Sequence, residues 1–228
     1  GMILGNSAFV YRKKGTQTFL SKGLIADHQV EPIHVDVSMV NFHDELDIQA
    51  AKNWQKDFQK AEFILENGKY IVGREVEKMS KSKYNVVNPD EICDVYGGDT
   101  LRMYEMFLGP IEQDKPWNTA GISGVHNFLK KIWRLFYHQD QWAVTETPPD
   151  AESKKILHKT IKKITEDIGR LSFNTCVSTF MICINELTTL KCSNKNVLAP
   201  LLILLSPFAP HFCEELWQKL GHTKSIAV

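Results

Sequence analysis

The sequence has no long apolar run and few cysteines. No apolar run approaches the roughly 20 residues that a membrane-spanning helix needs, and no charged segment precedes a short apolar stretch at the start. The five cysteines form no Cys-x-x-Cys pair and have no histidine at ligand spacing, so we expect no zinc or other metal site. An odd cysteine count in a helix-rich chain predicts reduced, buried thiols. These features favour a cytoplasmic protein with no membrane partner.

An excess of charge of one sign is also missing. The 228 residues include 27 Lys and Arg and 27 Asp and Glu, so the formal net charge is zero. A dedicated RNA-binding domain is usually basic overall, and total charge therefore does not favour RNA. Two local groups of cations at about helical spacing could still form basic stripes, or be solvated helix faces. The first group comprises Lys154, Lys155, Lys159, Lys162 and Lys163, and the second comprises Lys130, Lys131 and Arg134.

The strongest local signal is the pentapeptide Lys78-Met79-Ser80-Lys81-Ser82, which we call the KMSKS loop. Two lysines three residues apart, with hydroxyls beside them, can place ammonium groups on a polyphosphate. A helix start follows, because Asn88 is a good N-cap, Pro89 suits the first helical position, and Asp90 and Glu91 lie where the helix dipole favours negative charge. The pattern predicts a positioned cationic loop.

Residues 1–77, before the loop, have the pattern of a small α+β unit. Apolar and polar residues alternate from Ile33 to Met39, which predicts a half-buried strand. Asp47 is expected to cap a helix whose apolar face runs from Ile48 to Phe58. Asn67-Gly68 predicts a type I′ turn in a β-hairpin that leads into the KMSKS loop. The hairpin strands are expected at residues 62–66 and 69–72, and two shorter strands at 8–11 and 18–20.

After the loop the chain is predicted to be all-α. Gly97-Gly98 and Gly109-Pro110 end the first two helices, and long helices joined by short connections predict an antiparallel helix bundle. We expect no catalytic role for the scattered histidines, which show no paired acid or nucleophile, and a core or interhelix role for four tryptophans. The histidines are 126, 138, 158 and 211, the tryptophans are 117, 133, 142 and 217, and the helices are expected at residues 88–96, 99–107, 117–136, 151–169, 172–191, 196–205 and 209–220.

The KMSKS pentapeptide is identical to the signature loop of class I aminoacyl-tRNA synthetases, and a longer series of residues resembles leucyl-tRNA synthetase of the bacterial type. The resemblance runs from Lys78 to about Gly221, in order and at matching spacing. The matching stretches include Asn85-Val86-Val87-Asn88-Pro89, Tyr96-Gly97-Gly98-Asp99-Thr100, Phe173-Asn174-Thr175, Asn185-Glu186-Leu187 and Ser206-Pro207-Phe208-Ala209-Pro210-His211.

The resemblance implies a division into three parts. Residues 1–77 resemble the leucine-specific insertion, an α+β unit. Residues 78–125 resemble the KMSKS loop with the helical connecting segment, and residues 126–228 the anticodon-binding helix bundle. The family's enzymes are several times longer and carry a nucleotide-binding sheet and an editing domain, so we expect a fragment that is inactive alone. The insertion favours leucine among the aliphatic amino acids.

The resemblance also implies the site residues and partners. Lys78 and Lys81 are expected to be catalytic, with Lys78, Ser80, Lys81 and Ser82 binding ATP. ATP with Mg²⁺ is expected as a substrate of a monomeric full-length enzyme and not as a group held by this chain alone. The other expected partners are leucine and tRNA(Leu), with both cation groups defined above touching tRNA.

Two alternatives stay open. One is a non-catalytic tRNA-binding module derived from a synthetase, and the other is an isoleucyl, valyl or methionyl relative. The intact KMSKS loop favours the ligase, because a pure binding module has no need for both lysines.

Overall fold

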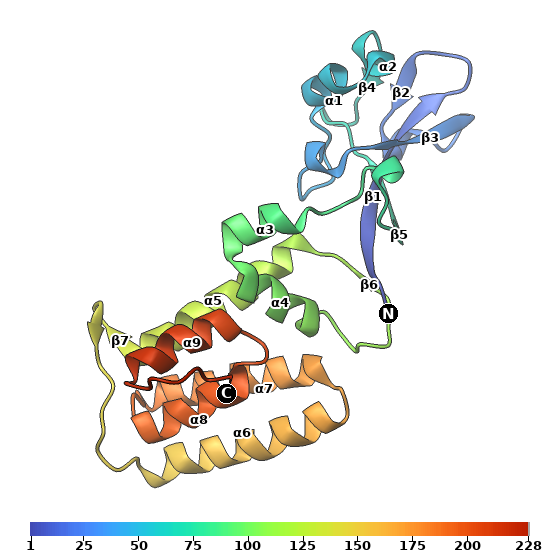
Figure 1. Ribbon diagram of the computed structural model, residues 1–228. Coiled ribbons are helices and arrows are strands. Elements are labelled where there is room, and N and C mark those ends of the chain that lie inside the picture. The colour runs from blue at the N-terminus through green and yellow to red at the C-terminus, as the bar shows by residue number, and fades with distance from the viewer. Residues whose placement is uncertain (228) are drawn as a thin grey trace. The chain divides into compact units, whose positions relative to one another are not determined.

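The computed structural model describes residues 1–227, which form two compact units. The sheet unit comprises Met2–Val87 and Asp114–Trp117. The helical unit comprises Gly1, Asn88–Gln113 and the chain from Asn118 onward. In Figure 1 the sheet unit is mostly blue to cyan, and the helical unit runs from green to red. The predicted order, an α+β part followed by an all-α part, is confirmed.

Strand β1 is the centre of a six-stranded sheet. It pairs antiparallel with β2, β3 and β5 and parallel with β6, while β4 pairs parallel with β2. The long β1–β3 and β1–β5 ladders place strands from distant parts of the sequence side by side (Figure 1). The strands are β1 (Ile3–Lys13), β2 (Thr18–Leu20), β3 (Val30–Val35), β4 (Glu62–Ile64), β5 (Gly73–Lys78) and β6 (Lys115–Pro116).

The core of the sheet unit is rich in aromatic side chains. Phe19, Phe58 and Tyr70 are almost fully buried, and Phe19 meets Phe58 edge-on at 5.3 Å between ring centroids. Burying an aromatic side chain of this size contributes on the order of 2 kcal/mol. The Tyr70 hydroxyl donates to the Leu20 carbonyl at 2.7 Å, so its one polar group does not oppose burial.

Two elements of the sheet unit are shorter than predicted. Strand β3 ends at Val35, because the Asp36 carboxylate accepts from the Ser38 N–H at 2.9 Å and starts the 3-10 turn η2 (Val37–Met39). The helix that Asp47 caps is interrupted at Gln55, whose backbone is extended (φ −130°, ψ 144°). The result is two helices, α1 (Ile48–Trp54) and α2 (Lys56–Gln59).

The predicted hairpin around Asn67-Gly68 is only half right. The turn forms, with φ of 51° and 78° at its two central residues and a bridge between Glu66 and Lys69. The flanking segments do not pair with each other beyond that bridge. Strand β4 pairs with β2 instead, and the chain after the turn joins β1 as β5. The local turn chemistry was readable from the sequence, but the strand partners were not.

The helical unit follows the predicted boundaries within two residues at most ends. Helix α5 starts where the Asn118 side chain accepts from Ala120 N–H at 3.0 Å, and α6 where Asp150 accepts from Ser153 N–H at 2.8 Å. Between α5 and α6 lies a short β-hairpin whose strands have two residues each, β7 (Tyr137–His138) and β8 (Gln141–Trp142). The helices are α3 (Pro89–Tyr96), α4 (Gly98–Phe107), α5 (Thr119–Phe136), α6 (Ala151–Gly169), α7 (Phe173–Thr189), α8 (Lys195–Leu205) and α9 (Pro210–Lys219).

Antiparallel packing of α6 on α7 forms one side of the bundle (Figure 1). Helix α7 buries Phe180, Ile184 and Leu187. All five cysteines are free, and four of them are buried, while Cys93 is half-buried. Burial raises the pKa of Cys183 to about 11, which keeps that thiol protonated at neutral pH. The core or interhelix role predicted for Trp142 was wrong, because this residue lies in β8 and is 40% exposed.

Within residues 1–227, none of the helices combines the length and the apolar character that a membrane crossing requires.

Candidate functional site

The KMSKS loop begins at the last residue of β5. Lys78 pairs with Leu4 of β1, and the chain then enters the 3-10 turn η3 (Lys81–Lys83). The Ser80 hydroxyl accepts from the Ser82 N–H at 3.3 Å, and the two serine hydroxyls lie 2.8 Å apart. The serines therefore shape the turn as it stands, since each hydroxyl already has a partner inside the loop.

A buried asparagine closes the loop. The Asn85 side chain is 1% exposed, and its oxygen accepts from the Ser80 N–H at 2.8 Å. Its amide donates to the Ser7 hydroxyl of β1 at 2.8 Å and to the Lys78 carbonyl at 3.3 Å. At Gly5 of β1, a Cβ atom would lie 2.6 Å from the Asn85 carbonyl oxygen, so the glycine permits this close approach. Both ends of the loop are thus held to the central strand.

The three lysines of this segment differ in their surroundings. Lys78 and Lys81 are exposed, and neither ammonium has an ion pair or hydrogen bond within the described residues. Lys83 is instead bound to Glu77, with 2.5 Å between Nζ and Oε1. The structure therefore separates two available cations, Lys78 and Lys81, from Lys83, which is engaged by Glu77.

Glu77 is the centre of a small polar network. Besides Lys83, its carboxylate contacts His34 Nε2 at 2.8 Å, and its side chain is 17% exposed. Hydrogen bonds from Lys83, and then from Ser7 and His34, lower the pKa of Glu77 to about 2. Glu77 thus stays ionised at neutral pH and holds Lys83 beside β5.

Tyr84, at the end of η3, joins the loop to the rest of the sheet unit. Its backbone is left-handed (φ 51°, ψ 33°), an uncommon conformation for an aromatic residue. Its carbonyl accepts from the Val37 N–H at 3.1 Å, and its ring meets Trp54 edge-on at 4.6 Å. Packing on α1 and η2 therefore holds the strained residue in place.

Sequence reasoning did not assign roles to Asn85, Glu77 or Tyr84. The available signal was a polar Asn85 between Tyr84 and the apolar pair Val86-Val87. A polar residue in such a setting is either exposed or bonded, and only the fold shows that β1 covers it.

The cations of α5 divide into two kinds. Lys130 and Arg134 are exposed, and neither has an ion pair within the described residues. The half-buried Lys131 donates from Nζ to Asn185 Oδ1 of α7 at 2.6 Å. The predicted group thus presents two available cations and one that also joins two helices.

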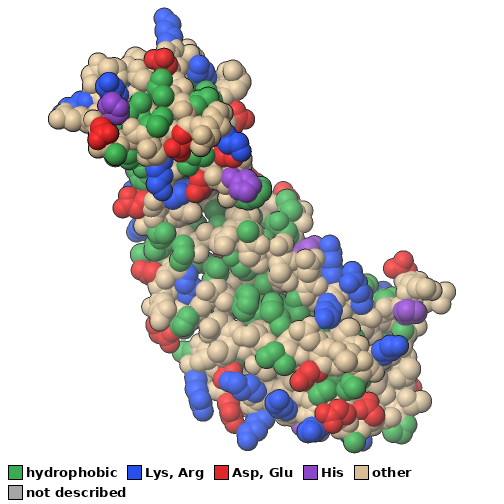
Figure 2. Space-filling model, turned by 180° about the vertical axis from the view of Figure 1, so that it is seen from behind, with side chains coloured by type: hydrophobic (Ala, Val, Ile, Leu, Met, Phe, Trp, Pro, Cys, Tyr) green, Lys and Arg blue, Asp and Glu red, His purple; other side chains and the backbone are tan. Residues whose placement is uncertain are grey.

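The five lysines of α6 are all exposed, but they do not form one uninterrupted stripe. Lys163 is bound to the buried carboxylate of Asp167 at 2.6 Å, which also accepts from the Thr175 hydroxyl at 2.7 Å. Lys155 lies 3.7 Å from Glu152. Figure 2 shows basic and acidic side chains interspersed along the lower edge of the helical unit. Lys154, Lys159 and Lys162 have no ion pair within the described residues.

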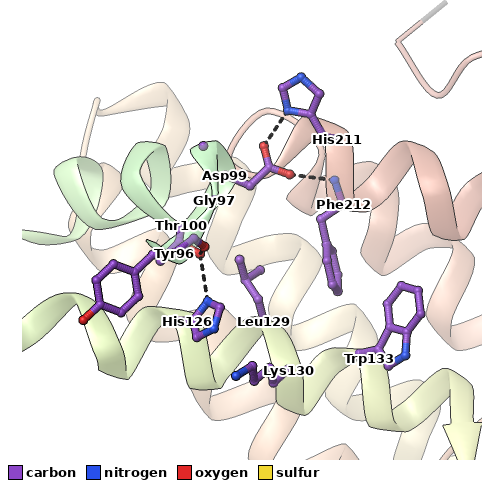
Figure 3. A pocket seen from close by; sticks show the side chains of 11 residues that line it. Tyr96, Gly97, Asp99, Thr100, His126, Leu129, Lys130, Trp133, His211 and Phe212 are labelled. Carbon is purple, nitrogen blue, oxygen red and sulfur yellow. Dashed lines mark hydrogen bonds and ion pairs between the residues drawn. The ribbon is translucent and has the colours of Figure 1, made fainter. Parts of the chain in front are cut away.

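A hollow of about 580 Å³ lies in the helical unit between the α3–α4 junction, α5 and the start of α9 (Figure 3). The Asp99 carboxylate at its edge accepts from the Phe212 N–H at 2.6 Å and pairs with His211 Nδ1 at 2.9 Å. The expectation that His211 has no paired acid was wrong. Asp99 binds the first turn of α9, and His211 is 89% exposed, so the pair secures a helix start.

No group of three or more His, Cys, Asp or Glu side chains that could hold a metal ion occurs within residues 1–227.

Two family models match this chain, over different residues. A family described as the anticodon-binding domain of tRNA ligase matches residues 150–228, and one described as tRNA synthetases class I (M) matches residues 39–128. The leucine–tRNA ligase of Christiangramia forsetii is 64% identical over 226 residues, and that of Flavobacterium psychrophilum is 63% identical over 230 residues. These alignments cover 99% and 100% of this chain. The chain belongs to the leucine–tRNA ligase family.

The chain spans 24% of the length of each of these two leucine–tRNA ligases. A solved structure agrees with the assignment: the ternary complex of Agrobacterium radiobacter K84 agnB2 LeuRS with tRNA and LeuAMS matches at a TM-score of 0.56 and 28% identity. That match covers 66% of this chain and 22% of the solved one. The resemblance to bacterial leucyl-tRNA synthetase is confirmed, and the identity to these relatives favours leucine over the isoleucyl, valyl or methionyl alternative.

Proposed function

We propose that this chain is the part of a leucine–tRNA ligase that supplies the phosphate-binding KMSKS loop and tRNA-contacting helices. The loop's role is supported by one observation: hydrogen bonds hold the ends of the loop in place, while two of its lysines are free to bind an anion. Buried Asn85 holds the loop ends, while Lys78 and Lys81 remain exposed and unpaired within the described residues.

Leucine activation suits such a loop. The leucine carboxylate attacks the α-phosphorus of ATP, a new carboxylate–phosphorus bond forms, and pyrophosphate leaves with its bonding electrons. Negative charge grows on the leaving oxygens, and preorganised cations stabilise that charge. Lys81 and Lys78 supply the positive charge from flexible stems. Ser80 and Ser82 keep the turn's shape and offer hydroxyls to ATP, which enters with Mg²⁺ as substrate.

The other assignments follow the three-part division. Residues 1–77 act as the leucine-specific insertion that carries the loop, residues 78–125 as loop and connecting segment, and residues 126–228 as the anticodon-binding part. RNA affinity would come from the available cations of α5 and α6, since the net charge is zero and supplies no general attraction. Phosphate contacts of this kind position tRNA without reading its bases.

The test compares the full-length protein with this chain. The full-length protein is expected to exchange pyrophosphate in the presence of leucine and ATP and to load leucine onto tRNA(Leu). The 228-residue chain alone is expected to stay at background in the exchange assay, because it spans only 24% of the length of the ligases that it matches. A full-length protein that binds tRNA without leucine-dependent exchange would instead be a non-catalytic module.

A further inference from the structure

One face of α5 carries aromatic side chains and cations in alternation. His126, Lys130, Trp133, Arg134 and Tyr137 recur at intervals of one to four residues and lie on the same side of the helix, or continue it into β7. Trp133 and Tyr137 are stacked, with 4.8 Å between ring centroids and 9° between planes. Both rings are only half-buried, so this stack reaches the surface.

Side chains of this face line two hollows. The first, described above, places His126, Trp133 and Phe212 around its apolar interior, with Lys130 at its edge (Figure 3). The second, of about 410 Å³, lies beside the β7–β8 hairpin and is lined by Lys130, Trp133, Arg134 and Tyr137. Lys130 and Trp133 line both hollows, which therefore adjoin each other, and we call the two together the α5 groove. Volumes of this size are typical of small-ligand sites.

The groove has the charge that a polyanion requires. Lys130 and Arg134 lie along it, exposed and without ion pairs in the described part of the chain. Both oxygens of Asp99 are already engaged, by His211 and by the Phe212 N–H. The other carboxylate that lines the groove, Asp140, lies at the exposed tip of the β7–β8 turn. The apolar interior is therefore edged by available positive charge.

We propose that this groove takes an unpaired nucleotide of the bound tRNA, with its base against Trp133 and its phosphates at Lys130 and Arg134. Aromatic faces beside a basic track are how proteins bind unstacked bases. The proposal rests on the tRNA role given above and adds a base contact to it. An apolar peptide would use the aromatic rings but not the cations, and a purely phosphate-based contact would use the cations but not the rings.

The experiment measures the affinity of the full-length protein for a tRNA(Leu) transcript at several salt concentrations. Trp133→Leu removes the ring and keeps an apolar side chain, and we expect Kd to rise about 5- to 150-fold, the effect of removing one base-stacking interaction. The salt slope should not change. Lys130→Ala should make the slope shallower by about one. Trp133→Phe should restore most of the affinity.

Trp217→Leu is the matched control, because Trp217 stacks on His222 outside the groove and the chemical change is the same. Equal losses in Trp133→Leu and Trp217→Leu, or none in the former, would overturn the proposal. Chemical modification of tRNA bases gives a measurement that does not depend on variant folding: an unpaired base should be protected by the unsubstituted protein, and no protected base contradicts the groove's role. Leucine-dependent pyrophosphate exchange needs no RNA, and so its failure counts against the proposed function alone.

Discussion

The Asn85 amide donates to the Ser7 hydroxyl at 2.8 Å, although the two residues lie 78 positions apart. Both residues are buried, at 1% and 0% exposure. The hydrogen bond ties the end of the KMSKS loop to the central strand of the sheet. The loop's base therefore belongs to the core of the sheet unit, while Lys78 and Lys81, which have no ion pair within residues 1–227, are exposed.

Asn85→Ala in the full-length enzyme should destabilise the loop. The change leaves the Ser80 N–H and the Ser7 hydroxyl without their buried partner, at a cost of about 1–3 kcal/mol. We expect faster proteolysis between residues 78 and 85 and a lower rate of adenylate formation. Asn88→Ala is the control, because it removes an N-cap of α3 outside the loop and should leave the cleavage pattern there unchanged. If the Asn85→Ala and Asn88→Ala variants were cleaved equally slowly between residues 78 and 85, the role of Asn85 would be contradicted.

Lys81→Ala should lower the single-turnover rate of adenylate formation by roughly a hundredfold, the effect of losing about 3 kcal/mol of charge stabilisation. Leucine affinity should change little, since the charge acts as pyrophosphate departs. Lys83→Ala is the matched comparison two residues along, and its effect should be much smaller, because Lys83 is bound to Glu77. If leucine binding fell by the same factor while the rate held, the assignment of Lys81 would be wrong.

Glu77 should make the free energy of unfolding depend on pH in the acid range. Its pKa is lowered to about 2 in the folded chain from an ordinary value near 4.5, so its contribution is complete above about pH 4.5 and is lost as pH falls through 2. Because solvent still reaches the carboxylate, we expect on the order of 1 kcal/mol. Urea unfolding of the wild type and Glu77→Gln between pH 6 and 2 measures this. The difference between them should shrink toward low pH, and a constant difference would exclude the linkage.

The α6 lysines differ in whether they have an ion pair within the described residues. The triple change Lys154/Lys159/Lys162→Ala should make the salt dependence of tRNA binding shallower, by about one for each phosphate that is no longer neutralised, without altering preference among leucine tRNAs. Lys163→Ala should instead lower the thermal midpoint, because it leaves the buried Asp167 carboxylate without its cation. An unchanged salt slope in the triple variant would place these lysines in bulk solvent.

Helices were predictable from the sequence because their signals are local. Asp47 and Asn88 were predicted as N-caps, and each accepts from a backbone N–H within three residues, so these caps could be recognised without knowledge of the fold. Strand partners could not be predicted in this way. Asn67-Gly68 made the expected turn, yet the following strand pairs with β1, because burial across the whole sheet decides the pairing.

The candidate site shows the same limit. Lys78 and Lys81 were recognisable from the pentapeptide, since their spacing and neighbours lie within five residues. The sequence does not show which lysine forms an ion pair, because Glu77 faces Lys83 only once β5 and η3 are folded. The α5 groove was also missed, since its two hollows are completed by Phe212 of α9 and by the β7–β8 hairpin.

Strand β1 forms hydrogen bonds with strands that lie far apart in the sequence and are therefore synthesised at different times. Its last partner is β6, where the Lys115 N–H donates to the Met2 carbonyl at 3.0 Å and the Trp117 N–H to the Leu4 carbonyl at 2.8 Å. On a ribosome, the sheet unit therefore cannot complete its hydrogen bonding until residue 117 has emerged, after α3 and α4. Until then β1 would keep an open strand edge, the state most prone to pairing with a neighbouring nascent chain.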